Sequence, residues 1–513
     1  MLLCLRQSRL DFARLIAPLQ AALLAACSAA PIDVPDPHAR ADGQQTISAV
    51  PQRPELAAED GGVGDYFGFS LASSGPSALI GAPGHRVLEN ADQGAVYALR
   101  LDAAEWFPHG PPLTADDGAR ADWFGYSIAM SGDTAVVGAP GHQVGDHPGQ
   151  GAAYVFVRRG AGFVQEGPAL VAADGRAYDA FGSSVAISGD TIVVGAPARD
   201  VDSKTDQGES FVFLRRDSTW AQQGSALVAE SGSAGDSFGS CVAISGNTVL
   251  VSAPIRRVGF NPYQGAAYVF VRDDQRWLPQ GDELVAPDGG PFDQLGACAL
   301  FGDMALLGAP FHTVLGNVEQ GAAYIFVRSA QTWSVQGPAW VAPDGAKGDH
   351  FANSVALTGD TALIAAPLRA SAGNGYSGSG YLFARTDSNW TAQGAGLAVD
   401  GGAPNELLGS SVALSENTAL LGAPFHQVAE HKLQGAAYAL ALERACAANC
   451  ESEICSGDVS CGANLQPLGG CVIANAGRQT RSNFSALAVL IGAIAIVSRR
   501  AVGSRFRGVS TRV

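Results

Sequence analysis

One phrase recurs along most of the chain, and its spacing constrains the fold more than any other feature. It reads FGYSIAMSGDTAVVGAP from Phe124, FGSSVAISGDTIVVGAP from Phe181 and FGSCVAISGNTVLVSAP from Phe238, with related forms from Phe67, Leu295, Phe351 and Leu408. The closing prolines are Pro83, Pro140, Pro197, Pro254, Pro310, Pro367 and Pro424, so successive spacings are 57, 57, 57, 56, 57 and 57 residues. Regular periods of this length are typical of propellers and arrays, whose repeats bury their apolar faces only against their neighbours.

Each repeat predicts four short strands. Residues 184–187 alternate in polarity, as a strand does, and Ser-Gly-Asp-Thr at 188–191 predicts a tight hairpin turn into a second strand at 192–196. Pro197 ends that strand because proline has no amide hydrogen. A loop of about a dozen residues precedes a third, wholly apolar strand such as 152–157. The fourth strand opens at an aromatic residue: Trp106, Phe163, Trp220, Trp277, Trp333 or Trp390.

The seventh repeat lacks its fourth strand, because a cysteine-rich segment follows its third strand at 436–442. Residues 54–58 supply a replacement, since Leu56 aligns with Leu113 one period of 57 residues later. Pairing of the two chain ends would remove the exposed edges of an open array. The sequence therefore predicts an all-β, seven-bladed β-propeller of four-stranded blades over 50–444, with repeats starting near 60, 117, 174, 231, 288, 344 and 401 and the ring closed by an N-terminal strand.

The phrases that open on Phe-Gly and end on Gly-Ala-Pro resemble the FG-GAP repeat of the integrin α-subunit propeller. They look closer still to the bacterial repeats in which Ser-Gly-Asp-Thr joins the first two strands. The resemblance covers Glu59 to about Leu442. It implies a propeller fold, and it is less informative about function because propellers host many unrelated activities.

The N-terminus indicates export. Arg6, Arg9 and Arg14 precede an apolar run at 15–26, which is typical of a secretory signal and too short to span a membrane. The run ends in Leu-Ala-Ala before Cys27, which resembles a bacterial lipobox, so Cys27 is a candidate for lipidation. Ser-Ala-Ala at 28–30 also permits an ordinary cut. We expect a signal peptide at 1–26 and a tether at 27–49.

The C-terminus carries a second candidate anchor at 471–513. An uncharged apolar stretch at 484–498 follows Gly-Gly-Cys471 and precedes several arginines. This order resembles the tripartite sorting signal of myxobacterial surface proteins, which would make Cys471 the processing and anchoring residue. The alternative is a plain membrane anchor, for which the stretch is only marginally long enough. Either reading predicts an exported protein attached at the outer membrane or the cell surface.

The remaining cysteines fit an oxidising compartment. The segment 445–470 holds four closely spaced candidates for two disulfides, Cys446, Cys450, Cys455 and Cys461, whose connectivity stays open. A zinc site is the alternative, although the spacing matches no standard zinc pattern. Cys241 and Cys298 occupy one position in successive repeats, and we expect them to be small buried thiols.

The charged residues that recur in the repeats indicate a structural role more than metal binding or catalysis. An acid stands two residues before each Phe-Gly position, namely Asp65, Asp122, Asp179, Asp236, Asp293, Asp349 and Glu406. We expect these acids to accept hydrogen bonds from loop amides. Histidines follow the closing prolines in four repeats (His85, His142, His312 and His426), and we expect equivalent positions on a ring to lie too far apart to share a metal. The spaced acids Asp200, Asp202 and Asp206 form a candidate calcium loop, set against a plain solvated loop.

The composition narrows the function. A net charge of -16 argues against nucleic acid, whose binding needs clustered Lys and Arg. The chain contains none of the common nucleophile, zinc-protease or phosphate-loop motifs, so we expect no enzyme and no cofactor other than the calcium considered above. The leading hypothesis is a surface-anchored module that binds a protein or polysaccharide through its loops. The alternatives are a passive structural envelope protein and a hydrolase or lyase acting on surface polysaccharide.

Overall fold

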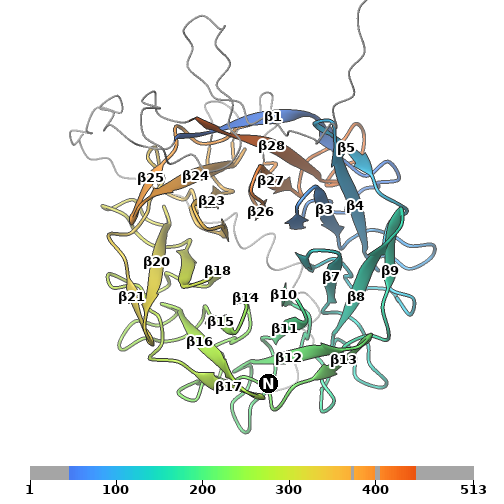
Figure 1. Cartoon of the computed structure of the whole chain (residues 1–513), viewed down its shortest axis with the longest axis horizontal. Helices are drawn as coiled ribbons and strands as arrows, with labels where there is room; N and C mark the ends of the chain where they lie inside the picture. The colour runs from blue at the N-terminus through green and yellow to red at the C-terminus, as the bar shows by residue number, and fades with distance from the viewer. Residues whose placement is uncertain (1–45, 371–374, 399–404, 446–513) are drawn as a thin grey trace, which may run out of the picture. The chain divides into compact units, whose positions relative to one another are not determined.

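The propeller is the part of the chain that can be described in three dimensions. The computed structural model describes residues 46–370, 375–398 and 405–445, all within one compact unit, Met1–Ser452. Seven antiparallel sheets of four strands stand around a central axis as the blades of a ring (Figure 1). Every regular element in these ranges is a β-strand. The prediction of an all-β, seven-bladed propeller is confirmed.

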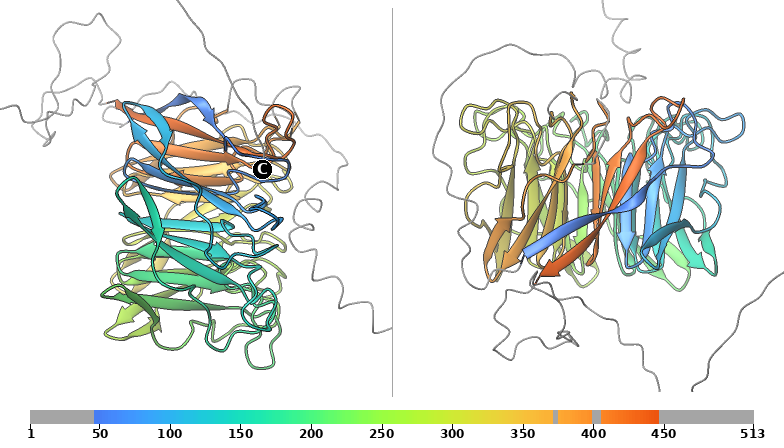
Figure 2. Two further views of the ribbon diagram at one scale, coloured as in Figure 1. Left: turned by 90° about the vertical axis from the view of Figure 1, so that its right-hand side faces the viewer. Right: turned by 90° about the horizontal axis from the view of Figure 1, so that it is seen from above.

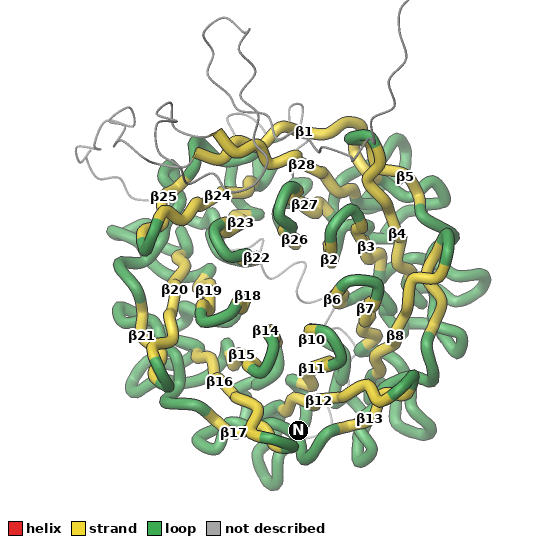
Figure 3. Tube along the Cα trace, viewed as in Figure 1, coloured by secondary structure: helices red, strands yellow, loops and turns green. Residues whose placement is uncertain are grey.

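Each blade is ordered from the axis outwards, and blades 1 to 7 follow the chain. The innermost strands, which face the centre in Figure 3, are β2 (Ser70–Ser74), β6 (Ser127–Ser131), β10 (Ser184–Ser188), β14 (Val242–Ser245), β18 (Ala297–Phe301), β22 (Ser354–Leu357) and β26 (Ser411–Leu414). The second strands are β3 (Ser77–Ala82), β7 (Thr134–Ala139), β11 (Thr191–Ala196), β15 (Thr248–Ala253), β19 (Met304–Ala309), β23 (Thr361–Ala366) and β27 (Thr418–Ala423). The third strands are β4 (Ala95–Asp102), β8 (Ala152–Arg159), β12 (Glu209–Arg216), β16 (Ala266–Asp273), β20 (Ala322–Ser329), β24 (Ser379–Thr386) and β28 (Ala436–Ala445). The outermost strands are β5 (Glu105–Pro108), β9 (Gly162–Gln165), β13 (Thr219–Gln222), β17 (Arg276–Pro279), β21 (Thr332–Val335), β25 (Asn389–Ala392) and, for blade 7, β1 (Thr46–Leu56).

The second strands form the most deeply buried layer. All six residues of each are buried, which matches their apolar sequence and their position between neighbouring blades. The turn before β11 places Gly189 at φ 56°, in the left-handed region that glycine adopts without steric cost. The outer strands other than β1 are only four residues long, and such short edges limit pairing with other chains.

Ring closure follows the predicted register. In blade 7, β1 pairs with β28, and Leu56 lies opposite Ala437, as Leu113 lies opposite Val96 in blade 1. The strand begins at Thr46, earlier than the segment 54–58 from which closure was predicted. The closing junction repeats contacts found elsewhere in the ring, because Gln434 Nε2 donates to Ala58 O at 2.9 Å and Gln150 Nε2 donates to Ala172 O at 3.0 Å. The N-terminal strand therefore takes the place of the fourth strand of blade 7, although its 11 residues make it longer than the other outer strands.

The apolar core lies between the blades. The residue at the first position of each phrase is almost fully buried, and Phe124 illustrates the packing: its ring meets those of Tyr154 and Phe156 edge-on at 5.6 and 5.8 Å. The same cluster includes Leu79 and Val96 of blade 1 with Val137 of blade 2, so each blade completes its core only against its neighbour. This packing explains why the repeat must continue around a closed ring.

Candidate functional site

One face of the ring carries the long loops, and the short turns lie on the opposite face (Figure 2). Each blade gives this loop face a hairpin loop after its second strand and a crossover from the preceding blade. Six of the hairpin loops share one backbone arrangement, in which a valine pairs with the residue three positions later: Val87↔Asn90, Val144↔His147, Val201↔Lys204, Val258↔Asn261, Val314↔Asn317 and Val428↔His431. The loop face therefore has a repeated backbone on which different side chains are displayed.

A buried acid supports each of these loops from below. In six blades its carboxylate accepts a hydrogen bond from the backbone amide three residues earlier, as between Ala119 N and Asp122 Oδ2 at 2.7 Å. The predicted role of the acids as acceptors for loop amides is thus confirmed in those six blades. All seven acids are buried, with at most 4% of their surface exposed.

Each acid also pairs with a basic residue, and we call the two residues together a loop-base pair. The partner stands two residues after the closing proline and is histidine in blades 1, 2, 5 and 7 (the His blades) and arginine in blades 3, 4 and 6 (the Arg blades). The pairs are His85–Asp65 at 2.7 Å, His142–Asp122 at 2.8 Å, Arg199–Asp179 at 2.6 Å, Arg256–Asp236 at 3.2 Å, His312–Asp293 at 2.7 Å, Arg369–Asp349 at 3.0 Å and His426–Glu406 at 2.8 Å. The arginines at this position were not predicted from the sequence, although their constant distance from the closing proline was a usable signal.

A second carboxylate completes each loop-base pair on the solvent side. In blade 2 it is Asp117, which lies 3.8 Å from His142 Nε2 and accepts a hydrogen bond from Tyr154 at 2.8 Å. The equivalent residues in blades 1, 3, 5 and 6 are also aspartates: Asp60, Asp174, Asp288 and Asp344.

Blades 4 and 7 obtain this outer carboxylate from another position. Their sequence has Ser231 and Gly401 where the other blades have aspartate. In blade 4, Glu283 replaces it, 3.2 Å from Arg256 and 2.8 Å from the Tyr268 hydroxyl. In blade 7, Glu55 of β1 lies 3.3 Å from His426 Nε2. The same charge arrangement is thus reached by two sequence solutions.

The surroundings raise the pKa of all four loop-base histidines. For His85, His312 and His426 the hydrogen bond to the buried acid is the main cause, and it outweighs the opposing effect of burial. For His142 burial is the largest single influence and lowers the pKa, but the hydrogen bond and charge of Asp122, with the charge of Asp117, raise it overall. Burial raises the pKa of Asp179 and Asp349 in the Arg blades, even though each is paired. These groups lie at the base of the loops and hold them in place through their bonds to one another.

Adjacent blades are also joined near the axis. A serine of the innermost strand donates to a backbone carbonyl of the next blade, as from Ser70 Oγ to Gly125 O at 2.7 Å and from Ser184 Oγ to Gly239 O at 2.7 Å. Cys241 and Cys298 occupy this serine position in blades 4 and 5, and they form a disulfide. The expectation of free buried thiols was wrong, because equivalent inner positions of neighbouring blades are only 6.0 Å apart between Cα atoms.

The tips of the loops differ strongly in character. Blade 3 shows carboxylates, with Asp200 and Asp202 exposed, whereas blades 4 and 5 show bare apolar side chains. Phe260 is 99% exposed and Leu315 is 93% exposed. Arg256 belongs to the buried base of its loop, while the neighbouring Arg257 is exposed.

The candidate calcium loop is partly occupied by its own backbone. Asp200 Oδ1 accepts a hydrogen bond from the amide of Asp206 at 3.0 Å, and Asp202 and Asp206 both have φ 53°. Within residues 46–370, 375–398 and 405–445, no group of three or more His, Cys, Asp or Glu is placed to hold a metal ion. Calcium binding by Asp200, Asp202 and Asp206 stays a prediction.

Cys27, Cys471 and the four clustered cysteines Cys446, Cys450, Cys455 and Cys461 lie outside the described residues. In the portion of the chain that is described, no helix is both long and apolar enough to pass through a membrane.

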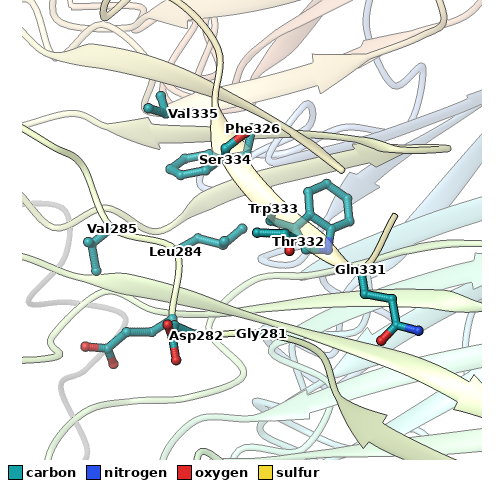
Figure 4. Close-up of a pocket in the computed structure, with 11 residues that line it drawn as sticks. Gly281, Asp282, Leu284, Val285, Phe326, Gln331, Thr332, Trp333, Ser334 and Val335 are labelled. Atoms are coloured by element: carbon teal, nitrogen blue, oxygen red, sulfur yellow. The ribbon is translucent and has the colours of Figure 1, made fainter. Parts of the chain in front are cut away.

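A shallow hollow lies on the outer side of the ring between the stretch 281–285 and β21 (Figure 4). Its volume is about 330 Å³, and Trp333 and Phe326 line it. The Trp333 indole donates to Gln280 Oε1 at 2.9 Å and lies beneath the Arg328 guanidinium, 5.3 Å away. An aromatic residue stands at the position of Trp333 in every blade that has a C-terminal outer strand, so the hollow reflects blade packing more than a specialised site.

Comparison with known proteins supports the repeat assignment. Residues 51–99, 112–156, 165–213, 220–270 and 339–383 match the model of the FG-GAP repeat, so the chain carries FG-GAP repeats. None of the curated proteins compared with the chain matches it. A solved structure entitled "Structure of YjhT" aligns at 13% identity over 66% of this chain and 99% of that chain, with a TM-score of 0.35. At that TM-score the likeness supports no statement about fold or activity.

Proposed function

We propose that this chain is an exported, surface-anchored propeller that binds a protein or polysaccharide ligand on its loop face, without catalysis. One observation carries the proposal: six loops share a backbone and a buried acid–base support, while the side chains at their tips differ. Rigid scaffolds that display variable loops are the usual basis of recognition surfaces.

The binding part of the proposal is tested with the full chain and purified cell-envelope protein and polysaccharide fractions. Replacing Glu89, Asp146 and Phe260 by serine alters three exposed tips without touching the loop-base pairs. We expect saturable binding that weakens at least tenfold in this variant. Asp217→Asn and Asp274→Asn, in turns on the opposite face, are the matched control and should leave binding unchanged. Saturable binding that only the control weakens, or turnover of a bound polymer, would contradict the proposal.

The location is supported by the Cys241–Cys298 disulfide, since disulfides persist mainly in oxidising compartments. We infer that Cys27, Cys471 or both attach the chain to the envelope, through a lipobox-like signal and a sorting-type tag. Mass spectrometry of the protein from its native membranes tests this. We expect loss of residues 1–26 or processing at Cys471, a lipid on the retained cysteine, and a peptide linking Cys241 to Cys298. An unprocessed, fully reduced chain would overturn the assignment.

A further inference from the structure

The junction between blades 5 and 6 lacks polar links that join other blades of the ring. Near the axis, each of the other six junctions carries either a serine bonded to the next blade or the Cys241–Cys298 disulfide. In blade 5, Cys298 keeps the 57-residue spacing but is bonded back to blade 4. Ala297, which takes the strand register of the serines, has no hydroxyl. Neither side chain therefore links blade 5 to blade 6.

The hairpin turns opposite the loop face show the same difference. A serine at the end of the innermost strand accepts a hydrogen bond from a glycine amide of the next blade, as Ser131 Oγ does from Gly189 N at 3.1 Å. This bond recurs at each of the first four junctions. Phe301 stands at this position between blades 5 and 6, and its ring offers no acceptor to the Gly359 amide.

Arginines of the third strands form another kind of link, near the rim of the ring. The Arg328 guanidinium of blade 5 donates to the Thr248 hydroxyl of blade 4 at 2.9 Å. The equivalent Arg385 of blade 6 meets the thioether of Met304 at 3.2 Å, and a thioether is only a weak acceptor. Every other blade has a hydroxyl at the position of Met304: Ser77, Thr134, Thr191, Thr248, Thr361 and Thr418.

Arg385 also lacks the ion pair that the equivalent arginines of blades 2, 3 and 5 make with an aspartate of their own blade. The corresponding aspartate of blade 6, Asp360, binds Arg444 of blade 7 at 2.6 Å. Within the described part of the chain, Arg385 Nε is buried without a hydrogen-bond partner. Asp360 thus ties blade 6 to blade 7 and leaves Arg385, which faces blade 5, with the thioether alone.

The outer tryptophans show a further difference. In blades 3, 4 and 5 the indole donates to a glutamate or glutamine of the preceding blade, as from Trp333 to Gln280 at 2.9 Å. The corresponding atoms between blades 5 and 6 are Trp390 Nε1 and Gln336 Oε1. Both are buried, and neither has a hydrogen-bond partner in residues 46–370, 375–398 and 405–445. Gln336 keeps only the bond from its amide nitrogen to Ser388 O, at 3.0 Å.

Apolar packing and loop-face backbone bonds keep this junction closed. Trp340 stacks on Phe383 at 5.0 Å and lies 5.1 Å from Trp390, and it replaces the leucine of other blades: Leu113, Leu170, Leu227, Leu284 and Leu397. Phe351 N donates to Gln320 O at 2.8 Å, as equivalent amides do elsewhere in the ring. Apolar contact is not directional, whereas buried polar atoms without partners cost free energy for as long as the blades stay together. Separation of the blades would return these atoms to water.

We propose that the ring opens transiently between blades 5 and 6, on the side away from the loop face. The parts on either side are firmly linked, because the Cys241–Cys298 disulfide joins blade 5 to blade 4 and the Arg444–Asp360 pair joins blade 7 to blade 6. The backbone bonds of the loop face serve as the hinge. Local opening of this kind begins at the least stable contacts of a fold, and it does not depend on what the loop face binds.

Met304 reports on this opening, because it is only 6% exposed in the closed ring and hydrogen peroxide oxidises its sulfur when solvent reaches it. The variant Thr191→Met places the same reporter at the equivalent position between blades 3 and 4, where Thr191 is also 6% exposed. That junction keeps the axis, turn and indole bonds. Both methionines lie in one full-length chain, so mass spectrometry of its peptides compares the two oxidation rates under identical conditions. Thermal unfolding confirms that the variant folds.

We expect Met304 to oxidise at least tenfold faster than the introduced methionine. Urea below the unfolding transition should accelerate Met304 oxidation with a smaller slope than that of global unfolding, since the opening exposes only part of the buried surface. Equal oxidation rates at the two positions would overturn the inference. A Met304 rate that does not respond to urea would show static exposure, and one that follows the global slope would show complete unfolding, so either result would also overturn it.

Discussion

The His blades and the Arg blades solve one problem with different chemistry. Both bury a carboxylate beneath a surface loop and satisfy it with a backbone amide and a basic side chain. In blade 2 that side chain is His142, which binds one inner acid and lies 3.8 Å from the outer one. In blade 3 it is Arg199, which contacts Asp179, Asp174 and Glu209 at 2.5 to 2.7 Å. Arginine keeps its charge at all relevant pH values, whereas histidine loses it, so only the His blades couple loop support to pH.

The largest effect should come from breaking a loop-base pair in an Arg blade. Arg199→Leu leaves Asp179 buried without its cation, and also removes the partner of Glu209, whose pKa is already raised by burial. Leaving buried charges unpaired costs about 3–5 kcal/mol, so we expect a loss of that size in the free energy of unfolding by urea at pH 7. Arg216→Leu, at an exposed arginine that ends β12 of the same blade, should cost less than about 0.5 kcal/mol. Equal losses in the two variants would show that the pair adds nothing to stability.

A smaller loss is expected in a His blade. His142→Leu removes one hydrogen bond to Asp122, which still accepts from the Ala119 amide at 2.7 Å. We expect a cost of about 1–3 kcal/mol in the same measurement at pH 6. His142→Arg should recover most of it, because arginine serves this position in three other blades. Replacement of the exposed neighbour Gln143 by leucine is the control, and a His142→Leu protein as stable as this control would remove the distinction between the two kinds of blade.

The next largest difference between the His blades and the Arg blades should appear in how the free energy of unfolding depends on pH. The pKa of His85, His142, His312 and His426 is raised from 6.5 in the folded state. Their stabilisation is therefore fully present below pH 6.5 and is lost as the pH rises through the folded-state values. Changing all four to arginine should flatten the decline in unfolding free energy above pH 6.5.

The difference in pH dependence between the unmodified chain and the variant with four arginines isolates the contribution of the four loop-base pairs that contain histidine. His109 and His350, whose pKa is lowered mainly by burial, are common to both and cancel. Urea unfolding between pH 6 and pH 9 measures the two slopes. A decline of equal steepness in both proteins would show that the loop-base histidines do not titrate with folding.

Much of the ring could be predicted because the repeat carries local and long-range information together. The spacing of the prolines set the number of blades, and the match between Leu56 and Leu113 set the register of the closing strand. The acids at the loop bases were also recognisable as hydrogen-bond acceptors. Their partners were not, because a position filled by both histidine and arginine does not look like a repeat until its geometry is known.

Positions near the axis were misjudged for a different reason. Cys241 and Cys298 were expected to be small buried thiols, and their equivalent positions in successive repeats did not by themselves indicate that they pair. Near the centre the blades converge, so the two residues are close enough to bond. The exposure of Phe260 and Leu315 could not be read from the sequence either, because it depends on which way the loop tips point.

The smallest change in stability should come from moving the outer carboxylate of blade 4 from Glu283 to position 231, where five other blades have aspartate. Glu283→Gln in blade 4 keeps an acceptor for the Tyr268 hydroxyl but removes the negative charge beside Arg256. Because this pair is partly exposed, we expect a loss of only about 0.5–1 kcal/mol in urea unfolding. Ser231→Asp, which restores the aspartate found in five other blades, should recover that loss in the Glu283→Gln background and add little to the unmodified chain. The two changes in unfolding free energy could instead add without coupling. That result would show that the outer carboxylates of blade 4 and blade 2 have different roles. The Arg blades and the His blades would then be equivalent only in their buried inner acid.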